Sequence, residues 1–180
     1  QPEIGNRILN KTQEICEAHT ELVPYNPKTH TGFLRHLMLR FGIRTQQLMV
    51  NIVTAYEDMD KLSPLVDGLL NDISEITSMV NNVNTRKADS AFGEYEILLY
   101  GQPTVKENIG NFTIDISANS FFQTNTIQGE ILYEQIVKAA RLSGEEIVYD
   151  LYCGIGSISL YLAPHAKKVY GFEIIRSSLE

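Results

Sequence analysis

A glycine-containing turn between an apolar stretch and a short helical stretch constrains the fold of this chain more than any other feature. Its sequence is Asp150-Leu151-Tyr152-Cys153-Gly154-Ile155-Gly156. An apolar strand is expected before it, over residues 146–152, and a helix (157–162) and a second strand (168–173) after it. Strand, helix and strand in this order form a β-α-β unit, which opens a parallel, doubly wound, Rossmann-like sheet. The glycines let the backbone pass close to a ligand, and the helix start offers unpaired N–H groups beside them.

The acidic residues beside this turn indicate which ligand it suits. Glu173 follows Gly154 by 19 residues and ends the second strand, where a carboxylate can accept both hydroxyls of a ribose. A dinucleotide would prefer a third glycine where Ser159 stands, and its pyrophosphate would be opposed by the charge of Asp150. S-adenosylmethionine (SAM) has no phosphate and carries an amino group and a sulfonium. The turn therefore favours SAM, while a nicotinamide-dependent oxidoreductase and a turn without any ligand remain as alternatives.

The residues before this unit predict a separate α+β arrangement. A helix is expected over residues 6–19, a hairpin of strands over 33–43 and 47–55, then a helix, and further strands over 76–84, 95–100 and 112–116. Ser63-Pro64 has the pattern of a helix cap followed by a first-turn proline, so the second helix should begin there. The chain therefore belongs to the α/β class, with a β-β-α-β unit preceding the β-α-β unit.

A third helix, expected over residues 127–141, joins the two parts. Its apolar stripe would consist of Ile127, Ile131, Ile136, Val137 and Ala140. The break between the halves lies near residues 115–125. We therefore divide the chain into a central α+β domain (1–117), which could contact RNA, and the incomplete opening of a Rossmann-like SAM domain (118–180).

Charge distinguishes part of the first half from the rest of an acidic chain. The net charge is −7, yet no Asp or Glu lies between Glu21 and Glu57. On a strand, His36, Arg40 and Arg44 would share one face, where they could contact RNA phosphates or form a solvated hairpin face. The two cysteines form no framework, and no apolar run is long enough to span a bilayer, so we expect a reduced, cytoplasmic protein without a metal site.

Two motifs in the second half resemble a known family. They are Ser120-Phe121-Phe122-Gln123-Thr124-Asn125 and, after a helix, the glycine turn that begins at Asp150. The pair resembles the RNA uracil-5-methyltransferases, above all the bacterial enzymes that methylate uridines in 23S ribosomal RNA, and the resemblance covers the chain to about residue 175. It implies a SAM-dependent reaction in which a cysteine thiolate adds to C6 of uracil. C5 then takes the methyl group, and a general base removes the C5 proton.

The resemblance also implies roles for individual residues. The expected cofactor-binding residues are Gln123, Asp150, Tyr152, Gly154, Gly156 and Glu173. Gln123 would bind the methionine end of SAM from a loop over the site, and Tyr152 would line the pocket. The two glycines would let the cofactor approach, and Glu173 would hold its ribose hydroxyls.

The chain also departs from the family pattern. The N-terminal RNA-binding β-barrel, the iron–sulfur cysteine cluster that members often have, and the segments that carry the nucleophile and the base are not in this sequence. We therefore expect an inactive fragment with no catalytic residue, which could self-associate through the strand edge at Val169, Tyr170 and Phe172. Residues 176–180 resemble a vector-derived tail. The alternative is an RNA-binding module with a vestigial cofactor loop.

Overall fold

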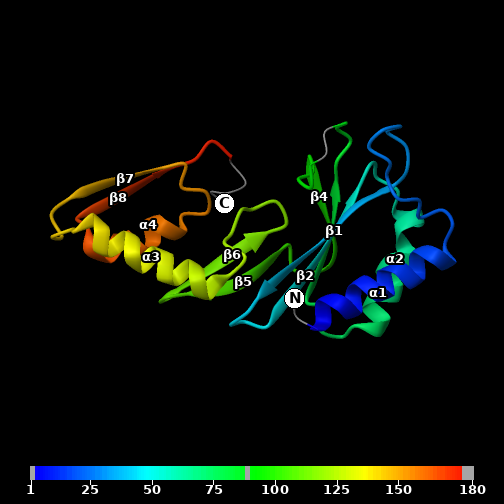
Figure 1. Cartoon of the computed structure of the whole chain (residues 1–180), viewed down its shortest axis with the longest axis horizontal. Helices are drawn as coiled ribbons and strands as arrows, with labels where there is room; N and C mark the ends of the chain where they lie inside the picture. The colour runs from blue at the N-terminus through cyan, green and yellow to red at the C-terminus, as the bar shows by residue number, and fades with distance from the viewer. Residues whose placement is uncertain (1–2, 88–89, 176–180) are drawn as a thin grey trace. The chain divides into compact units, whose positions relative to one another are not determined.

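The structure, a computed structural model, describes residues 3–87 and 90–175. It divides into two compact units (Figure 1). The first unit comprises Gln1–Phe41 and Gln46–Val105, and the second comprises Gly42–Thr45 and Lys106–Glu180. The boundary between the two compact units thus lies between Val105 and Lys106. The functional division that we expect after residue 117 stays a prediction. Residues 176–180, which we expect to be vector-derived, lie outside the described part of the chain.

The first unit is a four-stranded sheet with two helices. In chain order it contains α1 (Glu3–Ala18), β1 (Leu34–Gly42), β2 (Gln47–Thr54), α2 (Met59–Asp72), β3 (Ser78–Val83) and β4 (Tyr95–Gly101). The strand order is β1-β2-β3-β4, with β2 and β3 parallel across α2, and β3 and β4 antiparallel. The expected hairpin and β-β-α-β unit are therefore confirmed.

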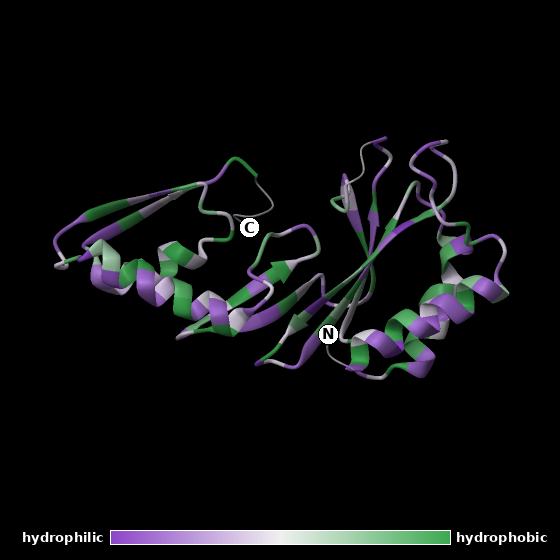
Figure 2. Ribbon diagram, viewed as in Figure 1, coloured by the Kyte–Doolittle hydropathy of each residue, from purple (hydrophilic) through white to green (hydrophobic). Residues whose placement is uncertain are grey.

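The core of this unit lies between the helices and the sheet. Ile8 on α1, Leu65 and Leu69 on α2, and Val50 and Ile52 on β2 are each buried within one hydrophobic cluster. Figure 2 shows hydrophobic residues interspersed with hydrophilic ones along both helices, as expected for helices with one buried face. None of the described helices is long and apolar enough to cross a membrane.

The start of α2 differs from our expectation. The helix begins at Met59, with Asp58 as its cap, so Pro64 lies inside it. Because proline has no backbone N–H, the Asp60 carbonyl lacks its usual donor from position 64. The Ser63 hydroxyl donates to that carbonyl instead, at 2.9 Å. The Ser-Pro pair that resembled a helix start therefore lies inside the helix, where the serine hydroxyl replaces the hydrogen bond that the proline cannot make.

The second unit contains a hairpin, a helix and the β-α-β segment. Its elements are β5 (Thr104–Ile109), β6 (Phe112–Ser117), α3 (Thr126–Ala140), β7 (Ile147–Leu151), α4 (Ser157–Leu162), a 3₁₀ turn (Ala163–His165) and β8 (Lys168–Phe172). β7 and β8 pair in parallel, with Asp150 opposite Gly171. The β-α-β prediction and the α/β class are thereby confirmed. The sequence did not predict β5, because the buried Glu107 interrupts its apolar alternation.

The expected apolar stripe of α3 is wrong. Ile127 and Ile131 are 55% and 47% exposed, and the buried positions are Thr126, Gly129 and Tyr133. A small residue and a polar-tipped aromatic make the close contacts, so hydrophobicity alone pointed to the wrong face. Ile136 and Val137 are half-buried and Ala140 is exposed.

One face of the β7–β8 pair is apolar and exposed. Tyr149 and Leu151 on β7 are 61% and 64% exposed, and Phe172 on β8 is 51% exposed. The rings of Tyr149 and Tyr170 are stacked, with centroids 5.6 Å apart. The described residues therefore leave this sheet face open to solvent.

Candidate cofactor site

The glycine turn between β7 and α4 follows a left-handed path. Tyr152, Gly154 and Gly156 have φ values of 64°, 56° and 79°. Nothing lies within 4 Å of a Cβ built on either glycine, so both face open space rather than packed atoms. Tyr152 is 86% exposed although a left-handed backbone is unfavourable for tyrosine. A strained residue with an exposed aromatic ring is typical of a ligand site rather than of a structural turn.

Glu173 joins the end of β8 to this turn. Its carboxylate accepts the backbone N–H groups of Ile175, Gly154 and Ile174, at 2.8, 2.9 and 2.7 Å. These hydrogen bonds, from Ile175 first, lower the pKa of the Glu173 carboxyl. A carboxylate is therefore held beside the glycine turn, as the spacing of 19 residues predicted.

Asp150 lies on the neighbouring strand and is held by α4. The Ser159 hydroxyl donates to its carboxylate at 2.6 Å. Ser159 occupies the position at which a dinucleotide site would prefer glycine. The hydroxyl there binds an acid, so the departure from the dinucleotide pattern has a structural reason.

Cys153 fills the turn. Its Sγ lies 2.8 Å from where a Cβ on Gly171 would stand, so the thiol occupies the space that the glycine leaves. Burial, followed by the charges of Asp150 and Glu173, raises the pKa of the Cys153 thiol. A thiol in this setting stays protonated and is a poor nucleophile.

The segment that contains Gln123 is anchored by its neighbours. Ser120 and Phe122 are buried, whereas Phe121 is 70% exposed. Asn125 caps α3 by accepting the N–H of Gln128 at 3.1 Å. Gln123 itself is half-buried and packs against Gly129, whose added Cβ would lie 3.3 Å from the Gln123 Cβ.

Helix α3 contacts α4, the helix that follows the glycine turn. The hydroxyl groups of Tyr133 and Ser157, the first residue of α4, lie 3.0 Å apart. Tyr133 is only 3% exposed, and its ring packs against Tyr161 with centroids 5.2 Å apart. The segment of Gln123 thus precedes a helix that also supports the turn of Gly154 and Gly156. Sequence reasoning missed Tyr133, whose only signal is a polar-tipped aromatic among the apolar residues of α3.

The basic residues do not form one strand face. Arg44 lies in the turn after β1, donates to the Asn108 carbonyl at 3.1 Å, and forms a two-pronged ion pair with Glu130. Glu130 raises the pKa of Arg44. Arg40 lies on β1, where burial lowers the pKa of its guanidinium and the charge of Glu96 opposes this. Only Arg40 and the half-buried His36 therefore share the expected strand face.

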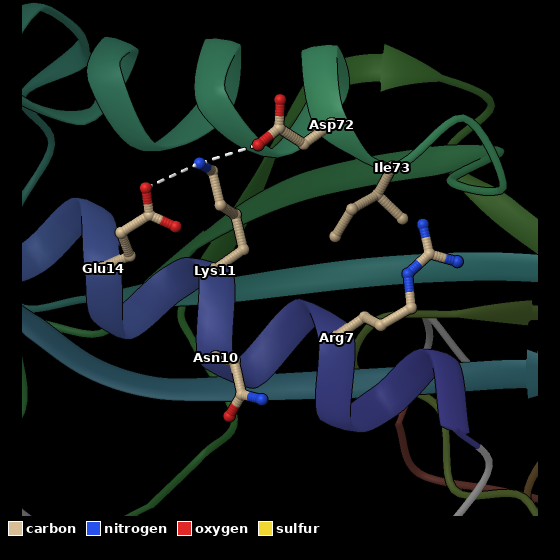
Figure 3. A pocket seen from close by; sticks show the side chains of 6 residues that line it. All are labelled: Arg7, Asn10, Lys11, Glu14, Asp72 and Ile73. Carbon is tan, nitrogen blue, oxygen red and sulfur yellow. Dashed lines mark hydrogen bonds and ion pairs between the residues drawn. The ribbon is translucent and has the colours of Figure 1, made fainter.

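A groove of about 340 Å³ lies elsewhere, on the first unit. As Figure 3 shows, Lys11 points between Glu14 and Asp72, with Nζ–oxygen distances of 3.1 and 2.7 Å. Arg7, on its rim, pairs with Glu75 at 2.6 Å. Both cations are neutralised by carboxylates, so the groove is a surface ion-pair cluster. Among residues 3–87 and 90–175, no group of His, Cys, Asp or Glu is arranged to hold a metal ion.

Comparison with known proteins identifies relatives along the whole chain. It is 45% identical over 179 residues to an uncharacterized RNA methyltransferase of Chlorobaculum tepidum, which covers 99% of this chain and 37% of the relative. It is 38% identical over 180 residues to an uncharacterized RNA methyltransferase of Bacillus cereus, which covers 100% of this chain and 39% of the relative. No protein-family model matches the chain.

A solved structure shares both the fold and part of the sequence. The tRNA (uracil-54, C5)-methyltransferase of Pyrococcus abyssi, in complex with S-adenosyl-L-homocysteine, superposes with a TM-score of 0.75 at 29% identity. The match covers 94% of this chain and 40% of that one. The chain thus spans about two fifths of the proteins that it matches. These matches confirm the expected kinship: over essentially its whole length, the chain is homologous to one segment of proteins named RNA methyltransferases.

Proposed function

We propose that this chain provides the cofactor-binding segment of a SAM-dependent methyltransferase that acts on C5 of uridine in RNA. The observation that carries the proposal is the pairing of an ionised Glu173 with the open, left-handed glycine turn at Gly154. The relatives named RNA methyltransferases, and the neighbour solved with S-adenosyl-L-homocysteine, support the same cofactor and the same reaction class.

The residues of the turn fit SAM. Two carboxylates, Asp150 and Glu173, stand beside it, and no Lys or Arg occurs between residues 142 and 166. Such a site disfavours a pyrophosphate and suits a ligand that carries positive charge and a ribose. Glu173 would accept the ribose hydroxyls, Tyr152 would cover the ligand, and Gln123 would hold its methionine end. When bound, SAM supplies an electrophilic methyl group.

The nucleophile for the uracil ring belongs elsewhere in this proposal. Burial raises the thiol pKa of Cys16, as it does for Cys153, so both cysteines of the chain are held as thiols. Methylation at C5 requires a thiolate that adds to C6, and a base that removes the C5 proton so that the thiolate can leave. We assign both groups to residues outside this segment, which by itself would then be inactive.

The RNA substrate and the cellular location of the protein complete the proposal. We propose 23S ribosomal RNA as the substrate, with His36 and Arg40 near its phosphates and a minor part for Arg44, whose charge Glu130 already neutralises. We also propose a cytoplasmic location, and self-association of the isolated segment through the exposed β7–β8 surface. An RNA-binding module with a vestigial cofactor loop is the alternative that the test must exclude.

The test is a calorimetric titration with S-adenosylhomocysteine, on this chain and on the protein at its full natural length. Glu173→Ala should abolish the binding shown by the natural protein. Glu145→Ala, which changes an exposed carboxylate just before β7, should leave the dissociation constant unchanged. If the folded natural protein binds no S-adenosylhomocysteine but binds RNA in a salt-dependent manner, the RNA-binding module is the correct account.

A further inference from the structure

Glu107, on β5, is a fully buried carboxylate outside the proposed cofactor site. Its exposure is 0%. One carboxylate oxygen accepts the backbone N–H of Ile43 at 2.7 Å and the hydroxyl of Thr126 at 2.9 Å. The other oxygen accepts the backbone N–H groups of Arg44 at 3.1 Å and Asn108 at 2.9 Å.

All four partners of this carboxylate are donors. Three backbone N–H groups and one hydroxyl thus supply two hydrogen bonds to each carboxylate oxygen. A buried carboxylate is costly to maintain unless its hydrogen bonds are complete. Glu107 therefore fixes the relative positions of the three segments that donate to it.

Two of these segments are the turn between β1 and β2 and the start of α3. The turn is pressed closely against β5, because a Cβ on Gly42 would overlap the Lys106 carbonyl, to which the Thr45 hydroxyl donates. Glu107 links this turn to α3 indirectly, and the ion pair between Arg44 and Glu130 links the two directly. The N-terminal part of α3 is thus held at two points, Thr126 and Glu130.

We propose that Glu107 is a positioning residue that fixes the 120–126 segment, and with it Gln123, for the cofactor. The proposal rests on the function proposed above. Thr126 comes three residues after Gln123, and the intervening Asn125 caps the helix. A shift of Thr126 therefore moves the backbone that carries Gln123, and a displacement of about 1 Å in a binding group is enough to reduce its contribution strongly. Glu107 touches no ligand itself and acts through the helix start.

The experiment is a double-mutant cycle read by S-adenosylhomocysteine binding to the protein at its full natural length. The variants are wild type, Glu107→Gln, Gln123→Ala and the double variant, each titrated at a temperature where circular dichroism shows it folded. Glu107→Gln places an amide N–H₂ among four donors and should raise the dissociation constant by about tenfold or more. In the Gln123→Ala background it should add less than about twofold, because the contact that it positions is already gone.

A matched carboxylate provides the control. Asp115 lies on β6 of the same hairpin and pairs with Lys106 at the surface, at 2.7 Å. Asp115→Asn should leave the dissociation constant within about twofold of wild type, because its carboxylate is half exposed and solvent screens its ion pair with Lys106. If Glu107→Gln does not fold, Thr126→Val removes one donor while keeping the side-chain shape. Thr126→Val should weaken binding, and Thr126→Ser should restore it.

The outcomes separate this proposal from the one on which it rests. Full additivity in the cycle, or unchanged binding by the Glu107 and Thr126 variants while Glu173→Ala abolishes it, would overturn the positioning role alone. Failure of the folded wild-type protein to bind S-adenosylhomocysteine would overturn both proposals. A Glu107 effect confined to the wild-type background would support both.

Discussion

Tyr152 should be a residue whose replacement by glycine stabilises the chain and weakens cofactor binding. Its φ of 64° is left-handed and its side chain is 86% exposed, so Tyr152→Gly removes strain and little packing. Left-handed geometry costs a non-glycine residue about 1–2 kcal/mol. The greater freedom of glycine in the unfolded chain offsets about 0.4–1 kcal/mol of that. The net gain is about 0.5–1 kcal/mol, or roughly 1–4 °C in Tm for a chain of this size.

The same substitution should reduce affinity for S-adenosylhomocysteine. An aromatic contact contributes about 0.5–1.5 kcal/mol beyond its buried area, so its loss raises the dissociation constant about two- to tenfold. Arg141 caps α3 with a φ of 49° and is exposed, which makes Arg141→Gly the matched control. It should give a similar gain in Tm with unchanged binding in calorimetry.

Two results would refute this reasoning. Loss of stability in Tyr152→Gly, measured by thermal and urea unfolding beside Arg141→Gly, would show that the tyrosine ring packs against the protein. Unchanged affinity in a well-folded Tyr152→Gly variant would remove Tyr152 from the cofactor site.

Three further predictions follow from hydrogen bonds of the two units. The lowered pKa of the Glu173 carboxyl means that the carboxylate stabilises the fold at neutral pH, and that this contribution is lost as the pH falls below about 4.5. Thermal unfolding measured across pH should therefore show that the Tm difference between wild type and Glu173→Gln becomes smaller in acid. Ser159→Ala removes the hydroxyl that donates to the carboxylate at the end of β7 and should cost about 1 kcal/mol in urea unfolding, whereas an unchanged midpoint would contradict the bond. Ser63→Ala should lower the free energy of unfolding by about 0.5–1 kcal/mol, because the Asp60 carbonyl loses its donor. In a Pro64→Ala background, the restored backbone N–H of residue 64 should cancel that loss. A loss that persists there would contradict the proposed role of the Ser63 hydroxyl.

The sequence predicted the elements whose signals are local. The strand expected over 146–152, the helix over 157–162 and the acid at Glu173 follow from spacing and alternation, and the structure has β7 over Ile147–Leu151, α4 over Ser157–Leu162 and Glu173 beside the turn. The β-β-α-β unit of the first sheet also followed from alternation and helix periodicity, whereas the antiparallel pairing of β4 with β3 was not predicted. These patterns succeed because each position's environment is dictated by its immediate neighbours in the chain.

Contacts between distant residues explain the failures. The sequence pattern around Glu107 is that of a surface residue, so strand β5 was not predicted. Glu107 is buried because three of its four partners lie 64, 63 and 19 positions away in the chain. Ser63-Pro64 matched a helix start although Asp58 supplied the real cap. The buried face of α3 is set by Tyr133, whose hydroxyl meets Ser157. No local sequence pattern identifies a residue that is buried because its partner lies far away in the sequence.

The stacked pair of Tyr149 and Tyr170 gives the chain a built-in optical reporter. The sequence contains nine tyrosines and no tryptophan, so its near-ultraviolet emission comes from tyrosine without tryptophan to mask it. The two rings of this pair are parallel to within 13° and lie on the open face of β7 and β8. Any surface that comes to cover this face would displace water from both rings at once. Tyrosine fluorescence, read against protein concentration, therefore follows the covering of that face without a label.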